Sequence, residues 1–319
     1  ATATSPPSAS APAAVPSKKV YAAPSSSKQQ PTGYTHFVSV PLGTVPEVRS
    51  AVESLLDHVR AVSGLPVVDA THIDAEHALV PGFLEKVAVL NAARQRGCDT
   101  GTTDGPSAAP NDGVDESILQ TPSKFHFTVL MLSLPTTDHV ERAKALQPAV
   151  AAALQRRFGN GTALHLAGLQ VMSHKPRESH VMYVELDDGT VTQDPAAAAG
   201  RRALTEFIAD VHRIFCDAGL VTDKEVMLGQ KIHATLLNSK WRQTRRNDDV
   251  ADPKNHRGPR NHWQRQQPFD ASSLLSILGA CRVAAGVPVG VELSRLTDAP
   301  NAVTGYYSSE FAIPAATAV

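Results

Sequence analysis

Two stretches of the sequence, KFHFTVLM at residues 124–131 and KIHATLLN at residues 231–238, repeat one pattern. Each places a lysine, an apolar residue, a histidine, an apolar residue and a threonine in that order, and then continues with apolar residues. Side chains along a β-strand point alternately to its two faces. Each stretch therefore predicts a strand with one apolar face, which the first stretch forms from Phe125, Phe127, Val129 and Met131. The opposite faces carry two matching polar rows: Lys124, His126 and Thr128, and Lys231, His233 and Thr235.

The repeated pattern suits the cleavage of a phosphodiester. In a chain with 13 histidines, about one His-x-Thr or His-x-Ser is expected by chance. Two copies in matching register are harder to explain as structural histidines. Two imidazoles can divide the proton transfers at one phosphorus, because one removes a proton from the attacking oxygen while the other protonates the leaving oxygen. Threonine hydroxyls two residues away can donate hydrogen bonds to the phosphate oxygens. We therefore predict His126 and His233 as the acid–base pair and Thr128 and Thr235 as phosphate-binding groups; the sequence does not assign acid and base.

The totals exclude several other classes of protein. The formal net charge of −1 provides no overall field that would attract a polyanion, so any contact with nucleic acid must come from local patches. Three widely spaced cysteines form neither a disulfide framework nor a Cys-x-x-Cys pair, which is typical of an intracellular chain. No apolar run approaches the roughly 18–20 residues that span a membrane. Without a cysteine cluster or a His-Glu-x-x-His motif, we predict neither a metal site nor a cofactor.

The distribution of apolar residues predicts an α+β fold with antiparallel pairing. Residues 1–33 are rich in serine, alanine and proline and are predicted to be disordered, and residues 34–319 are predicted to fold. Capping signals and apolar stripes predict helices over 48–62, from Asp138 to about Gly159, over 201–218 and after Asp270. Residues 98–113 and 239–268 read as loops. Strands are predicted at 34–42, 124–132, 163–172, 180–187, 231–238, 287–296 and 305–313.

A basic loop follows the second motif. Residues 240–265 contain eight lysines and arginines against three aspartates, together with two tryptophans, a combination that can follow a phosphate backbone and stack on bases. A solvated insertion beside the site is the alternative. For Lys124 and Lys231 the alternative is an ordinary strand-edge lysine, and for Tyr306 it is packing in the core. The candidate contacts to nucleic acid are Lys124, Lys231, Trp241, Arg242, Arg245, Arg246 and Tyr306.

The paired His-x-Thr strands resemble the signature of the two-histidine (2H) phosphoesterases. The resemblance extends over about residues 34–313, and within that family it is to the phosphoesterase domain of activating signal cointegrator 1 complex subunit 1 and the related A-kinase anchoring protein 7-like domain. It is carried by five blocks in order: THFVSVPL at 35–42, GVDESILQTPSKFHFTVLML at 113–132, KIHATLLNS at 231–239, QPFDASSLLSIL at 267–278 and GYY at 305–307.

The resemblance implies a two-lobed, LigT-like fold. Each lobe would be a small antiparallel sheet with helices, and a pseudo-twofold axis would relate the lobes around a central cleft where the motif strands meet. It also implies a metal-independent phosphodiesterase acting on RNA ends or on cyclic or 2′,5′-type nucleotide linkages, in the nucleus or cytoplasm. The context would be RNA processing, transcription coactivation or repair, with subunits of a cointegrator or helicase complex as partners.

Two points limit what the resemblance implies. The alternative function is a non-catalytic adaptor that binds a nucleotide or an RNA end in the same cleft. The cointegrator subunit typically carries an N-terminal KH domain with a Gly-x-x-Gly loop, and residues 1–33 cannot form one.

Overall fold

The computed structural model describes residues 33–74, 76, 78–98, 112–222, 231–242 and 267–315. The described residues from Gly33 onward belong to one compact unit. The predicted disordered segment, apart from Gly33, and most of the two predicted loops lie outside the described residues.

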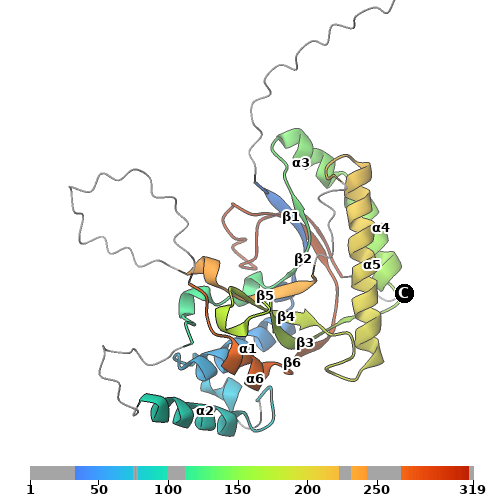
Figure 1. The fold of residues 1–319 in the computed structure, drawn as a ribbon. Coiled ribbons are helices and arrows are strands. Elements are labelled where there is room, and N and C mark those ends of the chain that lie inside the picture. The colour runs from blue at the N-terminus through green and yellow to red at the C-terminus, as the bar shows by residue number, and fades with distance from the viewer. Residues whose placement is uncertain are drawn as a thin grey trace, which may run out of the picture. The chain divides into compact units, whose positions relative to one another are not determined.

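Strands and helices alternate irregularly along the chain, which confirms the predicted α+β class (Figure 1). The strands are β1 (His36–Val40), β2 (Phe127–Leu132), β3 (Leu164–Val171), β4 (Val181–Leu186), β5 (His233–Asn238), β6 (Arg282–Val287), β7 (Val291–Arg295) and β8 (Ser309–Ile313). The helices are α1 (Pro46–Ser63), α2 (Phe83–Cys98), α3 (Thr137–Lys144), α4 (Gln147–Phe158), α5 (Pro195–Asp217) and α6 (Ser272–Leu278). No helix in the described part of the chain is long and apolar enough to cross a membrane.

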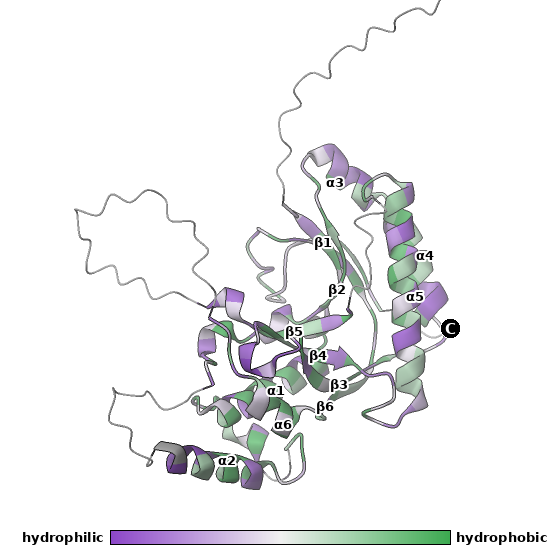
Figure 2. Cartoon of the chain, in the orientation of Figure 1, coloured by the Kyte–Doolittle hydropathy of each residue, from purple (hydrophilic) through white to green (hydrophobic). Residues whose placement is uncertain are grey.

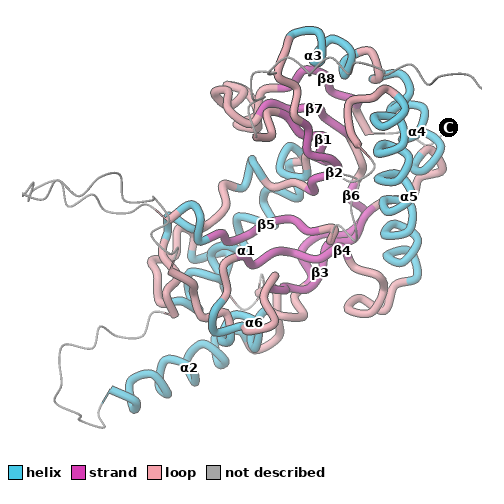
Figure 3. The backbone as a smooth tube through the Cα atoms, turned by 45° about the horizontal axis from the view of Figure 1, so that its top comes forward, coloured by secondary structure: helices cyan, strands magenta, loops and turns pink. Residues whose placement is uncertain are grey.

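The strands form one sheet in the order β6-β3-β4-β5-β2-β1-β7-β8, and every pairing in it is antiparallel. Figure 3 shows β1, β7 and β8 on one side of β2, and β3, β4 and β5 on the other. The expectation of two separate small sheets therefore needs correction, because β2 and β5 join the two groups of strands. The pseudo-twofold relation between two lobes stays a prediction.

The join between β2 and β5 consists of a single residue pair, Phe127 opposite Ala234. Beyond it, the edge of β5 is occupied by another segment: Leu119 bridges Leu237, and the Gln120 amide donates to the Leu236 carbonyl (2.8 Å). The two motif strands meet at one point and then take different neighbours. The two side chains of the joining pair are fully buried.

Amphipathic helices cover the sheet. α4 and α5 pack side by side, and α5 contacts β2 and β3, while α1 contacts α6 and β6. Figure 2 shows hydrophobic residues interleaved with hydrophilic ones along α4 and α5, as expected of helices that bury one side. The buried stripe of α5 includes Leu204, Phe207, Val211 and Phe215, in agreement with the predicted one. The helix itself begins earlier than predicted, after Asp194, whose carboxylate accepts from the Ala196 amide.

Several elements differ from their predictions, and helix α2 was not predicted at all. The single helix expected from Asp138 to Gly159 is two helices, since Pro148 would remove a hydrogen bond inside one continuous helix but is tolerated in the first turn of α4. The cap of α3 is Thr136, not Asp138. Strand β6 was not predicted, because its Ala-Ala-Gly segment at 284–286 has weak strand propensity and is ordered by pairing with β3.

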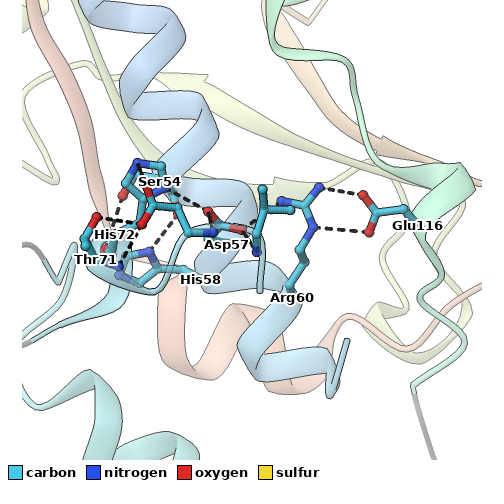
Figure 4. A network of polar contacts seen from close by, with 9 residues as sticks. Ser54, Asp57, His58, Arg60, Thr71, His72 and Glu116 are labelled. Carbon is cyan, nitrogen blue, oxygen red and sulfur yellow. Dashed lines mark hydrogen bonds and ion pairs between the residues drawn. The ribbon is translucent and has the colours of Figure 1, made fainter. Parts of the chain in front are cut away.

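A polar network fixes the segment that follows α1 (Figure 4). The buried Asp57 carboxylate accepts hydrogen bonds from the Val68 and Asp69 amides and from Arg60, and it lies 2.8 Å from Nδ1 of His72. Burial opposes ionisation of Asp57, but these hydrogen bonds outweigh it and lower the pKa of the carboxyl. Arg60 also contacts Glu116 (2.5 Å). Every group in this network is engaged by another, so we assign it a structural role.

Candidate active site

The four motif side chains lie around the pair that joins β2 and β5. Directly opposed residues of an antiparallel pair share a face, and successive residues alternate between faces. Continued by one residue in each direction, the register of Phe127 with Ala234 places His126 across from Thr235 and Thr128 across from His233, on the face away from the buried pair. The histidines are diagonal neighbours, which in such pairs are about 7–8 Å apart. Burial is the main cause that lowers the pKa of His126, and the charge of His233 lowers it further, so the two rings lie within electrostatic reach.

Both histidines are held by the same hydrogen bond. Nδ1 of His126 lies 2.7 Å from the Lys124 carbonyl oxygen, and Nδ1 of His233 lies 2.7 Å from that of Lys231. A carbonyl oxygen only accepts, so each Nδ1 carries a proton and donates it. In the neutral ring Nε2 is then the acceptor, and no described residue hydrogen-bonds to either Nε2 atom. Each histidine therefore presents the same nitrogen for proton transfer.

Aromatic rings surround His126. Its ring centroid lies 5.2 Å from that of Phe37, 5.9 Å from Tyr307 and 6.0 Å from Tyr306. This apolar enclosure disfavours the imidazolium and lowers the pKa of His126 from 6.5 to about 4, although the hydrogen bond to the Lys124 carbonyl opposes the shift. The free protein at neutral pH therefore holds His126 in its neutral form.

His233 has fewer neighbours. Among the described residues its one aromatic contact is with Tyr183 of β4, at 5.6 Å between centroids. Burial lowers the pKa of His233, and the charge of Lys231 lowers it further, against the effect of the hydrogen bond to the Lys231 carbonyl.

The two threonines are half-buried next to the histidines. Neither Thr128 nor Thr235 hydrogen-bonds through its hydroxyl to any described residue, so both hydroxyls have a proton to donate. Ser39 pairs with Thr128 across β1 and β2, and its hydroxyl hydrogen-bonds the Tyr306 hydroxyl (2.8 Å). The row on this face therefore continues from Thr128 to Ser39.

The alternation predicted that Lys124 and Lys231 belong to the two motif strands, but both lysines lie outside them. Lys124 ends a 3-10 turn that Pro122 begins, and Lys231 precedes the first residue of β5. Each ammonium group nevertheless lies near the site. The Lys124 Nζ atom is 5.1 Å from the centre of the Tyr307 ring, and the Lys231 Nζ atom is 4.8 Å from that of Tyr183.

The apolar face of β2 also departs from strict alternation. Val129 has no partner on β1, because Thr128 opposes Ser39 while Leu130 opposes Val38. This bulge reverses the parity beyond it. Leu130 is therefore buried, whereas Met131, predicted to share the face of Phe127, is half-buried.

The remaining residues predicted to contact nucleic acid lie in different surroundings. Trp241 is exposed. The Arg242 guanidinium instead binds within the protein, where it donates to the Gly113 carbonyl (2.6 Å) and pairs with Asp115 (3.1 Å). Arg245 and Arg246 lie outside the described residues. Tyr306 is buried, in line with the alternative of core packing. Contact of these residues with nucleic acid stays a prediction.

Sequence reasoning missed Tyr183, and of the neighbouring Tyr306 and Tyr307, both expected from the family resemblance to lie at the cleft, it named Tyr306 as the candidate contact. Tyr183 lies on a predicted strand and opposes Thr235, so only the pairing of β4 with β5 brings it to the second motif. Tyr307 comes from the segment before β8, far from the first motif in sequence. No group of three or more metal-ligating side chains gathers in the described residues.

Comparison with known proteins identifies one family. The model of the AKAP7 2'5' RNA ligase-like domain matches residues 34–314, nearly the whole described chain. No curated protein matches the sequence.

Proposed function

Because the chain belongs to the family of AKAP7 2'5' RNA ligase-like domains, in the 2H phosphoesterase superfamily, we propose that it is a phosphodiesterase. Its substrates are RNA ends or cyclic or 2′,5′-type nucleotide linkages, and its chemistry is acid–base catalysis by two histidines. The family resemblance extends the proposal to an RNA-processing, coactivator or repair context in the nucleus or cytoplasm, with cointegrator-type subunits as partners.

In this proposal the scissile phosphate binds between His126 and His233. One Nε2 atom accepts a proton from the attacking oxygen, and the other, protonated, donates a proton to the leaving oxygen. The Thr128 and Thr235 hydroxyls donate to the non-bridging oxygens, where negative charge accumulates in the transition state. Reversing the direction of attack exchanges the roles of the two histidines.

The observation that carries the proposal is the matched pair of Nδ1–carbonyl hydrogen bonds. Each bond fixes a tautomer and a ring orientation, and together they present two equivalent Nε2 atoms on one face. The structural His58 also binds a carbonyl oxygen through Nδ1, that of Ser54, but its Nε2 accepts from the Leu79 amide. The Nε2 atoms of His126 and His233 have no such partner among the described residues. Unengaged threonine hydroxyls beside both rings support the same reading.

The experiment is hydrolysis of 2′,3′-cyclic nucleotides and of 2′,5′- and 3′,5′-linked oligonucleotides, each with and without a chelator. We expect product from at least one linkage and a rate that the chelator leaves unchanged. We also expect a bell-shaped dependence of kcat/KM on pH, because one ring must be neutral while the other is protonated. Since both pKa values lie below 6.5 in the free protein, the maximum of kcat/KM falls on the acid side of pH 6.5.

The rival function is recognition without turnover. Tight binding of these oligonucleotides with no product at any pH between 4 and 9 would identify the protein as an adaptor. Loss of activity on chelation would overturn the two-histidine scheme instead.

A further inference from the structure

Each motif histidine belongs to a repeated group of three side chains. In the first group Lys124 lies over the ring of Tyr307, which makes a T-shaped contact with the ring of His126. The second group repeats this arrangement with Lys231, Tyr183 and His233. The tyrosines come from unrelated places, since Tyr183 is on β4 and Tyr307 precedes β8. Equivalent strand positions therefore do not explain why both lysines meet a tyrosine.

The two ammonium groups are not neutralised by the described part of the protein. Neither Lys124 nor Lys231 forms an ion pair with a described carboxylate, whereas Lys144 pairs with Glu141 and Lys175 with Glu178. A cation over an aromatic ring keeps its full charge while its position is restricted. The contact with tyrosine therefore leaves both lysines available to an anion.

The two lysines lie on opposite sides of the histidine pair. Lys124 is three residues before Phe127, and Lys231 is three residues before Ala234. Because Phe127 and Ala234 oppose each other on antiparallel strands, the chain leaves this pair in opposite directions toward the two lysines. The order along the site is therefore Lys124, His126, His233 and Lys231.

We propose that Lys124 and Lys231 bind the two phosphates that flank the scissile one, so that the preferred substrate is a linear oligonucleotide with phosphates on both sides of the cleaved linkage. The inference rests on the proposed function and narrows it. A 2′,3′-cyclic mononucleotide or a dinucleoside monophosphate has one phosphate and leaves both lysines unused. Tyr183 and Tyr307 are positioning residues that hold the ammonium groups in line.

The test compares two substrates with the same scissile bond, in whichever linkage the wild-type protein cleaves. One is a dinucleoside monophosphate, and the other is the same dinucleotide with a phosphate at each end. For the wild type we expect kcat/KM to be higher for the second substrate by about three- to fivefold per added phosphate, the upper range for exposed ion pairs. We also expect its logarithm to fall with log salt concentration by about 0.7 more per flanking phosphate.

Substitutions then assign each phosphate. Lys124→Met and Lys231→Met should each remove the gain from one terminal phosphate, and the double variant should remove both. Lys144→Met, on α3 away from the site, is the matched control and should retain the full gain. Tyr183→Leu should lose the same gain as Lys231→Met, whereas Tyr183→Phe retains the ring and should retain the gain.

The outcomes separate the inference from the proposed function. If the wild type cleaves neither substrate, the proposed function fails. If it cleaves both equally, or if the double lysine variant keeps the full gain from terminal phosphates, the enzyme stands and the flanking-phosphate inference is overturned. A gain that is lost in Tyr183→Phe as well would overturn the positioning role of the ring.

Discussion

The two halves of the candidate site share one hydrogen-bond pattern and differ in what surrounds it. Nδ1 of each histidine binds the carbonyl oxygen two residues earlier, at 2.7 Å in both. His126 is enclosed by Phe37, Tyr306 and Tyr307, whereas His233 meets one described ring, that of Tyr183. The local sequence therefore gives both rings the same orientation. Tertiary packing determines how strongly burial disfavours protonation of each ring.

The surroundings of the two histidines also determine how the reaction should depend on pH. Burial lowers the pKa of both histidines, and it lowers that of His126 to about 4. A bound phosphate brings negative charge beside both imidazoles, which favours their protonated forms. We therefore expect the pH dependence of kcat to lie at higher pH than that of kcat/KM.

The largest expected effect is the loss of either histidine. His126→Ala and His233→Ala should each lower kcat by about 10²–10⁴-fold, because each removes one of two proton transfers. The double variant should be little worse than the single ones, since the two groups act in one step. Steady-state kinetics on the best substrate provides the measurement. A large loss for only one histidine would break the equivalence of the two halves.

The threonines test whether both halves hold the phosphate. Thr128→Val and Thr235→Val keep the branched shape and remove the donor, and each should lower kcat by about 10²–10³-fold. Thr205→Val, on the exposed side of α5, is the matched control and should leave kcat unchanged. Equal rates for wild type and both site variants would contradict the assigned phosphate contacts.

The pKa of His126 predicts acid sensitivity of the fold. Between pH 6.5 and 4 the unfolded chain binds a proton at His126 that the folded chain does not, so the free energy of unfolding rises with pH over this window. Acidification from pH 7 to 4 should remove roughly 3 kcal/mol through this residue. Urea unfolding at several pH values measures the loss. His126→Gln should lack this component, and His233→Gln should retain it.

The smallest effects come from two tyrosine hydroxyls. Tyr306→Phe leaves the fully buried Ser39 hydroxyl without its partner and should lower the free energy of unfolding by about 1–2 kcal/mol. The Tyr183 hydroxyl is buried and has no hydrogen-bond partner among the described residues, so Tyr183→Phe removes an unpaired buried polar group and should leave the free energy of unfolding unchanged or raise it. Urea unfolding at pH 7 compares the two; equal losses would contradict the difference between the halves.

Much of the fold could be predicted from local patterns. Period-two alternation gave the two motif strands, apolar β-rich runs gave five more, and the spacing of apolar residues gave α1 and the stripe of α5. Helix α2 was missed, and the failures at β6 and Met131 occurred where distant residues decide. The Ala-Ala-Gly segment of β6 is a strand because β3 pairs with it. The pairing of β2 with β1 leaves Val129 without a partner, and this bulge moves Met131 off the predicted face.

The sequence by itself determined the motif side chains and their common local geometry. In each copy the histidine follows a lysine by two residues, which places its Nδ1 beside that lysine's carbonyl, and threonine follows by two more. This short-range arrangement depends on few residues, so it can be read from a pattern.

Only the tertiary structure decided that the two copies meet and that they differ. The single pair of Phe127 with Ala234 joins strands more than a hundred residues apart, and no local spacing encodes it. The rings over the two histidines and lysines come from β1, β4 and the segment before β8. Solvation and charge depend on every group within a few ångströms, wherever it lies in the chain.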